Sequence, residues 1–315
     1  MVKIRSEQEL IEELVKINQN YQSKSNKCVE AENDRRITGL AVASPAPVGL
    51  FRSRLSFAYI RRRRKMEDYK LLIDLHKQGH RQGPGGDTET EIALNLTMID
   101  RNARLKIADI GCGTGASTLL LARLLKNSHI TAVDFLQDFL DVLIKRAENA
   151  GIADRISTLT RSMEDLPFAN EELDLIWSEG AIYNIGFEKG IKNWRRYLKT
   201  NGLLVASEIT WISDSRPAEI QTHWDKEYPE IDLASQKLRI LEKHGYSPIG
   251  FFILPKHCWL DEYYRPMQDR FDDFLDRNGN SKEACEIVAA EKHEINLYEK
   301  FKDHVSYGVY IGRKL

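Results

Sequence analysis

Alternate glycines mark the stretch of this chain best suited to hold a nucleotide. Gly111, Gly113 and Gly115 follow the strand-like run 106–110, and a helical pattern begins at Ala116. Glycines let a ligand approach the backbone, and the N–H groups at the start of a helix point toward it. This pattern is typical of a cofactor site, because three glycines would destabilise a plain connection between a strand and a helix.

Two classes of cofactor are compatible with this turn. The spacing of Gly111, Gly113 and Ala116 fits the relaxed dinucleotide fingerprint, which predicts a nicotinamide- or flavin-dependent oxidoreductase. Asp109 favours S-adenosylmethionine instead, because a carboxylate repels a pyrophosphate but attracts the ammonium of an amino-acid moiety. Both classes need a second carboxylate for the ribose hydroxyls. Asp134 is expected to supply it at the end of the next strand, with a helix cap as the alternative role.

A third block separates the two classes. Residues 161–168 read RSMEDLPF. A turn then enters another strand pattern, residues 173–178, which read LDLIWS. With the glycine turn and Asp134, these blocks resemble the class I S-adenosylmethionine-dependent methyltransferases, in particular the small-molecule enzymes of the ubiquinone/menaquinone-biosynthesis type. The resemblance spans roughly residues 82–254. One departure is Ser162, where that family usually has an aspartate.

The resemblance implies S-adenosyl-L-methionine as the cofactor. The glycine turn would hold its amino-acid end, and Phe135 would lie beside the adenine unless it only packs in the core. Ser162 and the backbone of Met163 would meet the base edge. The expected cofactor-binding residues are Asp109, Gly111, Cys112, Gly113, Gly115, Asp134, Phe135, Ser162 and Met163.

The acceptor site is expected over the carboxyl ends of the strands, where open α/β sheets bind ligands. Glu179 and Tyr183 follow the fourth strand and are the candidate catalytic residues, to touch the acceptor or to assist proton removal. Glu179 could instead cap a helix, and Tyr183 could simply pack. Residues 81–86 could fold over the cofactor as an entrance loop. Several aromatic residues could line the acceptor pocket or belong to the core: Trp211, Trp224, Tyr228, Trp259, Tyr263 and Tyr264.

Composition narrows the class of protein further. Residues 1–65 carry 14 Lys+Arg and 7 Asp+Glu, whereas residues 66–315 carry 32 Lys+Arg and 40 Asp+Glu. Residues 66–315 are therefore acidic, which argues against a nucleic-acid substrate. The scattered cysteines and histidines have no metal-ligand spacing, so no metal is expected. No apolar run is long enough to span a bilayer and no secretion signal is recognisable, so a reducing cytoplasm is the expected location.

Residues 1–65 differ in kind from the rest. Residues 7–17 could form a short amphipathic helix, and the basic run 61–65 could bind acidic lipid or nucleic acid. We expect instead an extension that is disordered or not native, with residues 66–315 forming the methyltransferase domain.

Strand patterns alternate with helical patterns in that domain. Strands near 107–110, 129–134, 156–160, 173–178 and 203–209 predict an α/β fold, a Rossmann-like seven-stranded mostly parallel sheet with helices on both faces and an antiparallel last strand. Late strands at 247–254 and 307–311 would form a hairpin at one edge.

Two helical patterns, 261–277 and 282–302, lie between those late strands and predict a helical insertion over about 256–305. This insertion would form an added subdomain or the contact of a homodimer.

The sequence therefore predicts a methyltransferase that transfers a methyl group in line to a small-molecule acceptor. The alternatives are a regulator or partner subunit that binds the cofactor without activity, and a dinucleotide-dependent oxidoreductase. The identity of the acceptor does not follow from these residues, because function resides in the site rather than in the fold.

Overall fold

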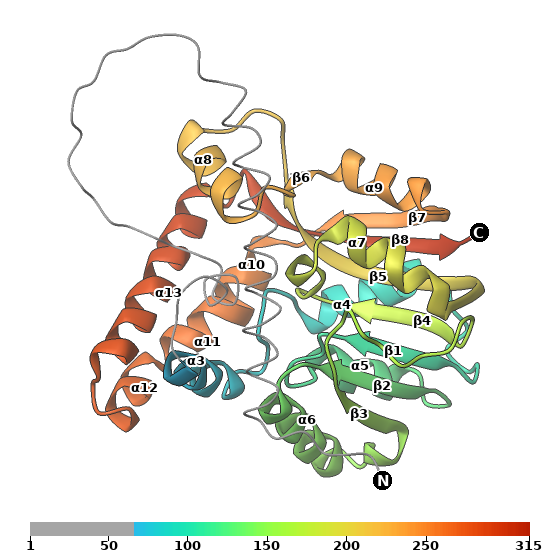
Figure 1. The fold of residues 1–315 in the computed structure, drawn as a ribbon, viewed down its shortest axis with the longest axis horizontal. Helices are drawn as coiled ribbons and strands as arrows, with labels where there is room; N and C mark the ends of the chain where they lie inside the picture. Colours follow the sequence, from blue (N-terminus) through green and yellow to red (C-terminus); the bar gives the residue numbers. More distant parts are fainter. Residues whose placement is uncertain (1–65) are drawn as a thin grey trace, which may run out of the picture. The chain divides into compact units, whose positions relative to one another are not determined.

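A computed structural model describes residues 66–315 of the chain (Figure 1). Its contacts divide the chain into two units, Met1–Lys70 and Leu71–Leu315. The expected helix over 7–17 and the basic run 61–65 lie outside the described residues. The described chain begins with helix α3 (Met66–Lys77), and everything that follows concerns the second unit.

The second unit is built on one sheet with the strand order β3-β2-β1-β4-β5-β8-β7. The strands are β1 (Lys106–Ile110), β2 (His129–Asp134), β3 (Ile156–Thr160), β4 (Leu173–Ser178), β5 (Leu198–Trp211), β7 (Tyr246–Ile253) and β8 (Val305–Lys314). The first five pair in parallel, and β8 is antiparallel to both of its neighbours. The α/β fold expected from the alternation of strands and helices is confirmed.

The sheet has one more strand than expected. The short strand β6 (Asp232–Leu233) pairs in parallel with the end of β5, which makes eight strands in the described residues. Strand β8 lies inside the sheet between β5 and β7, so β7 forms the edge. β6 has only two residues, which is too short a run to show a strand pattern in the sequence.

Helices cover both faces of the sheet (Figure 1). They are α4 (Asp87–Leu96), α5 (Ala116–Leu124), α6 (Gln137–Asn149), α7 (Phe187–Trp194), α8 (Ala218–Glu227) and α9 (Ala234–Lys243), with 3-10 turns at Ala153–Arg155, Ile182–Asn184 and Arg195–Tyr197. The largest part of the core lies under α7 and α9, where Phe187, Ile191 and Trp194 pack on buried residues of β1, β4 and β5. These strands read as continuous apolar runs because both of their faces are buried.

A helical segment connects β7 to β8, as expected for 256–305. It consists of α10 (Lys256–Trp259), a π-helical turn (Leu260–Tyr264), α11 (Arg265–Gln268), α12 (Phe271–Arg277) and α13 (Lys282–Phe301). The single helix expected over 261–277 is therefore broken into short pieces. Residues 256–268 are helical throughout, with Pro266 directly after the π-helical turn, and the helix is interrupted at residues 269–270 before α12.

Register places the ends of the central strands together. Asp109 pairs with Ala132 of β2 and with Trp177 of β4, so Asp134 and Ser178 end at the same edge of the sheet as β1. The glycine turn and the residues after β4 therefore meet at the carboxyl edge, where open α/β sheets bind their ligands. No helix within residues 66–315 is long and apolar enough to cross a bilayer.

Candidate functional site

The glycine turn joins β1 to α5 in left-handed backbone. Gly111 and Gly113 have φ of 77° and 55°, values that other residues adopt only with strain. The N–H groups of Gly111 and Cys112 both donate to the carbonyl of Val133, at 2.8 and 3.0 Å, which ties the turn to β2. Cys112 itself is buried, and burial raises the pKa of its thiol well above the ordinary value.

Protein atoms fill the space beside these glycines. A Cβ on Gly111 would overlap the side chain of Ala181, and a Cβ on Gly113 would overlap the amide end of Gln82. Backbone geometry and packing thus account for the glycine at 111 without a ligand. At Gly113 the neighbour is the end of a flexible side chain, so a bound molecule could take its place.

Asp134 connects the end of β2 to the turn. Its Oδ2 accepts the N–H of Gly113 at 2.9 Å, and its Oδ1 accepts the N–H of Leu136 at 2.9 Å. Burial raises the pKa of this carboxyl, while the backbone hydrogen bonds oppose the rise. Each carboxylate oxygen can accept a further hydrogen bond, so the pair of oxygens suits the two hydroxyls of a ribose. Phe135 follows and is half-buried.

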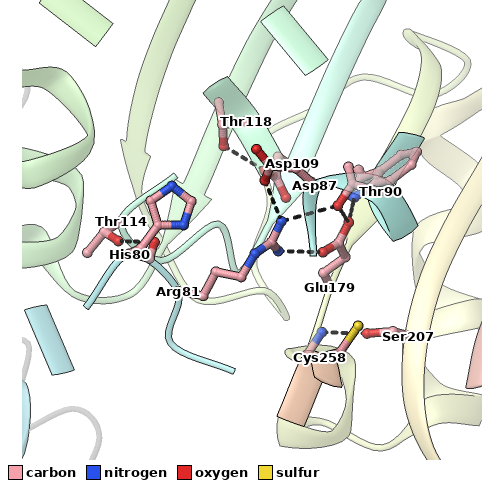
Figure 2. Close-up of polar contacts among 12 residues, drawn as sticks. His80, Arg81, Asp87, Thr90, Asp109, Thr114, Thr118, Glu179, Ser207 and Cys258 are labelled. Carbon is pink, nitrogen blue, oxygen red and sulfur yellow. Dashed lines mark hydrogen bonds and ion pairs between the residues drawn. The ribbon is translucent and has the colours of Figure 1, made fainter. Parts of the chain in front are cut away.

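Asp109 lies one layer deeper, below the turn. Its side chain is buried, and the hydroxyl of Thr118 on α5 donates to its Oδ2 at 2.6 Å (Figure 2). Burial, together with the nearby charges of Glu179 and Asp134, raises the pKa of Asp109 to about 7, although the hydrogen bond from Thr118 and the charge of Arg81 oppose the rise. This carboxyl would ionise more readily beside a cationic ligand.

Arg81 and Glu179 form a nearly buried ion pair beside the turn (Figure 2). Arg81 donates through Nη1 to Glu179 Oε2 at 3.0 Å and through Nη2 to Asp87 Oδ1 at 3.0 Å. Oε1 of Glu179 accepts the Thr90 hydroxyl at 2.8 Å and the Trp177 indole N–H at 2.9 Å. Glu179 is therefore held on three sides, which is the environment of a positioning carboxylate.

The segment before α4 is fastened onto the glycine turn. Oε1 of Gln82 accepts the backbone N–H of Thr114 at 2.8 Å, and Arg146 of α6 donates to the carbonyls of Gly79 and His80 at 3.0 and 3.2 Å. Sequence analysis expected an entrance loop at residues 81–86. It did not single out Arg81 or Arg146, whose partners Glu179 and Gly79 lie far away in the chain, nor Thr118, which faces Asp109 from the next helix.

The remaining expected residues lie around this edge. The Ser162 hydroxyl accepts the N–H of Glu164 at 3.3 Å, and the carbonyl of Met163 accepts the Trp194 indole N–H at 2.9 Å. The Met163 side chain ends close to Gly111. Tyr183 meets Tyr228 edge to face, with ring centroids 6.3 Å apart. Their roles toward a cofactor or acceptor stay predictions.

The aromatic residues of the second half divide into separate groups. Trp259 stacks on Tyr298 at 4.4 Å between centroids and meets Tyr307 at 5.0 Å, inside the helical segment after β7. Trp211 is buried under the guanidinium of Arg216, which lies 4.3 Å from its ring centroid. Packing explains both tryptophans, and a place in the acceptor pocket stays a prediction for Tyr228 and for Tyr263.

The charge of this edge discriminates between the two cofactor classes. The carboxyl groups of Asp134 and Glu179 act on buried Asp109, and the cations nearby are Arg81, already paired with two carboxylates, and Arg146, which donates to Thr114 in the turn. Such a site repels a pyrophosphate and attracts a ligand that carries ammonium and sulfonium charges. The residues present thus fit S-adenosylmethionine better than a dinucleotide.

Comparisons with known proteins agree with this geometry. Residues 107–202 match the family described as methyltransferase domain. One relative is an uncharacterized methyltransferase, YodH, of Bacillus subtilis, with 32% identity over 36% of this chain and 47% of the relative. The C-methyltransferase UbiE of Geotalea daltonii has 30% identity over 33% of this chain and 46% of the relative. The release factor glutamine methyltransferase of Francisella tularensis has 47% identity over 21% of this chain and 23% of the relative. The chain spans less than half the length of these relatives.

A solved structure extends the similarity over the fold. The S-adenosylmethionine-dependent methyltransferase from Geobacter sulfurreducens, in complex with S-adenosyl-L-homocysteine, superposes with a TM-score of 0.69. The alignment has 17% identity and covers 78% of this chain and 98% of that one, so it shows the likeness of the fold.

The sheet order and the acidic glycine turn define the class I S-adenosylmethionine-dependent methyltransferases. Residues 107–202, which contain the glycine turn, Asp134 and the blocks after it, match a methyltransferase domain. The resemblance of the glycine turn and the blocks after it to class I S-adenosylmethionine-dependent methyltransferases is therefore confirmed, and a ubiquinone/menaquinone biosynthesis C-methyltransferase is among the relatives.

Proposed function

We propose that this chain binds S-adenosyl-L-methionine and transfers its methyl group to a small-molecule acceptor. The observation that carries the proposal is the carboxyl edge of the sheet, where the four carboxyl groups of Asp87, Asp109, Asp134 and Glu179 outnumber the guanidinium groups of Arg81 and Arg146. The names of relatives leave the acceptor class open, because they include enzymes for a quinone precursor and for a release factor. The acidic body of the chain favours a small acceptor over nucleic acid.

Four groups of this chain would hold the cofactor. Asp134 would accept the ribose hydroxyls, and Asp109 would attract the ammonium from below the turn. Phe135 would lie against the adenine, with Ser162 and Met163 at the base edge. The turn residues Gly111, Cys112, Gly113 and Gly115 would surround the amino-acid end, with Gln82 moving aside at Gly113.

The cofactor supplies an activated methyl group and its own leaving group, so the protein has mainly to orient the acceptor and exclude water. Glu179 would help to orient the acceptor by fixing Arg81 and the loop before α4, because its oxygens already accept hydrogen bonds from three side chains. Tyr183, which ends near Tyr228, would be the group that contacts the acceptor. We place this reaction in a reducing cytoplasm, and a homodimer through the helical segment 256–301 is part of the proposal.

One observation favours a second candidate, a cofactor-binding regulator without transfer. Glu179, the carboxylate closest to the expected acceptor site, is engaged by Arg81, Thr90 and Trp177, and proton removal would have to break these contacts. Methyl transfer to an acceptor that is already deprotonated needs no base, so this observation does not exclude transfer.

Ligand binding separates these functions. We expect S-adenosylhomocysteine to raise the melting temperature of the full chain, and NAD to leave it unchanged. Asp134→Asn should weaken S-adenosylhomocysteine about tenfold or more, because hydrogen bonds to a charged acceptor are lost. Asp141→Asn is the matched control, since Asp141 is an exposed carboxylate on α6 that bonds only Gln137 among the described residues.

Two outcomes would contradict the proposal. Stabilisation by NAD alone would exclude S-adenosylmethionine as the cofactor, and unchanged affinity in Asp134→Asn would remove Asp134 from the site. Release of S-adenosylhomocysteine from S-adenosylmethionine in the presence of a metabolite extract would distinguish transfer from binding. Tight binding with no release in any fraction would favour the regulator.

A further inference from the structure

Three potential metal ligands meet beside the entrance loop, although no spacing in the sequence suggested a metal. Glu89 lies on α4, and His257 and Cys258 lie on α10, nearly 170 positions later in the chain. One ligand atom of each residue lies within 4.8 Å of the other two. The fold thus assembles a carboxylate, an imidazole and a thiol at one point.

The spacing of these atoms is that of a tetrahedral zinc site. Nε2 of His257 lies 3.2 Å from Oε1 of Glu89 and 3.7 Å from Sγ of Cys258. Zinc bonds of about 2.0–2.3 Å at tetrahedral angles put neighbouring ligand atoms roughly 3.3–3.7 Å apart. The two distances measured from His257 Nε2 are therefore close to those of a zinc site, and the Glu89 and Cys258 ligand atoms lie within 4.8 Å of each other.

The carboxylate of this cluster is buried with few donors around it. The Glu89 side chain is 6% exposed, and its Oε2 has no hydrogen bond from a nitrogen or oxygen donor of the described residues. The Cys258 thiol, a weak donor, is its neighbour and is fully buried. A buried carboxylate with so few donors is costly, and a cation bound to it would offset that cost.

The types of ligand select the ion. A thiolate and an imidazole disfavour Mg²⁺ and Ca²⁺, which take oxygen ligands, and favour Zn²⁺. A zinc ion with one thiolate, one carboxylate and one neutral imidazole is electrically neutral as a whole, which suits a buried position. Three protein ligands leave one position open for water or another ligand.

We propose that Glu89, His257 and Cys258 bind a zinc ion that joins α10 to α4. As the Sγ–zinc bond forms, the thiol proton leaves to solvent, and His257 contributes the lone pair of Nε2. The carbonyl of Cys258 accepts the N–H of Gly85 at 3.4 Å, so the ion stiffens the entrance loop from its outer side. The site is separate from the residues that we assign to the cofactor.

The test uses the full chain without an affinity tag, made metal-free with a chelator. Zinc is titrated against a chromophoric competitor, and Co²⁺ is titrated alone to follow its thiolate charge-transfer absorption. We expect one ion per chain, with Cys258→Ser losing at least about 100-fold in affinity and all of the cobalt–thiolate band. Cys285→Ser is the matched control, because Cys285 is an exposed thiol that should not matter.

A second variant guards against misfolding. His257 is 47% exposed, so His257→Ala should fold like the wild type by circular dichroism and still lose zinc affinity. Zinc binding that is equal in the wild type, Cys258→Ser and His257→Ala would overturn the proposal, as would a cobalt spectrum without a thiolate band. Neither result depends on methyltransferase activity.

Discussion

At the scale of single residues, burial decides what the carboxylates of this edge can do. Asp109 is buried against Thr118 and keeps its proton up to a pKa of about 7, whereas an exposed aspartate would be ionised at that pH. The charged groups that face it are Glu179, Asp134 and Arg81. A cationic ligand would join Arg81 in favouring ionisation, so the titration of Asp109 and the binding of the ligand are coupled.

The first prediction follows from this coupling. If the ligand ammonium binds ionised Asp109, the affinity for S-adenosylhomocysteine should rise as the pH rises through 7, by up to about tenfold between pH 6 and 8. Isothermal titration calorimetry at several pH values measures it. Asp109→Asn should lower the affinity at pH 8 and flatten the profile.

Glu208 provides the control for that profile. Burial also raises its pKa to about 7, and its ion-pair partner is Lys237 rather than a group of the glycine turn. Glu208→Gln should therefore keep the pH dependence of binding. If the pH dependence of binding disappears in Glu208→Gln and persists in Asp109→Asn, the titrating group is Glu208, and our interpretation of Asp109 is rejected.

At the scale of elements, a buried ion pair connects strand to helix. Nζ of Lys237 on α9 lies 3.4 Å from Oε1 of Glu208 on β5 and donates to the carbonyl of Glu230 at 2.6 Å. Both side chains are at most 1% exposed. The ammonium of Lys237 also lies 5.0 Å from the ring centroid of Phe187 on α7. This pair fixes the position of α9 over the carboxyl half of β5.

The second prediction concerns that pair. Lys237→Met should lower the free energy of unfolding by about 3 kcal/mol, because Glu208 is left buried without its cation. Loss of the ammonium raises the pKa of Glu208 further, so the folded state binds more protons than the unfolded state and the destabilisation should grow from pH 6 to pH 8. Urea denaturation at both pH values measures it.

The double variant Lys237→Met with Glu208→Gln tests the cause. It removes the uncompensated charge and should recover most of the lost stability at pH 8. A double variant as unstable as Lys237→Met would show that the lysine acts through packing alone.

The elements also show which sequence patterns were informative. The expected bounds of 129–134, 156–160 and 173–178 are those of β2, β3 and β4. Each has a strong apolar period between clear turn residues, so local sequence decides its type. β5 is longer than expected, from Leu198 to Trp211, because Leu198 pairs with Leu173 of β4 before a register shift that takes up Asn201 and Gly202, and pairing with β8 extends to Trp211.

At the scale of the whole molecule, the cofactor residues and the proposed zinc ligands all belong to the unit Leu71–Leu315. The sheet and its core lie in this unit as well. The domain boundary near residue 66 stays a proposal, based on the change of composition along the chain.

The third prediction tests that boundary. A chain that starts at Met66 should melt within about 3 °C of the full chain and bind S-adenosylhomocysteine with an affinity within about threefold, because the core would be complete. Calorimetric scans and titrations of both chains provide the comparison. A truncated chain that fails to fold, or that loses the ligand, would show that residues 1–65 contribute to the domain or its site.

The sequence alone determined the class of this domain and the type of its cofactor. Strand–helix alternation follows from local periodicity. The glycine turn, Asp109 and Asp134 are close together along the chain or at fixed spacing, so the order of residues alone indicates their arrangement. These predictions hold because the backbone geometry of a strand–turn–helix unit depends mainly on neighbouring residues.

Only the tertiary structure decided which distant side chains meet. It paired Arg81 with Glu179, placed Lys237 against Glu208, and brought Glu89 to His257 and Cys258. It also showed that protein atoms fill the space beside Gly111 and that Glu179 is already engaged by three donors. Such contacts depend on how helices from separate parts of the chain pack on the sheet, and packing of this kind leaves no periodic signal in the sequence.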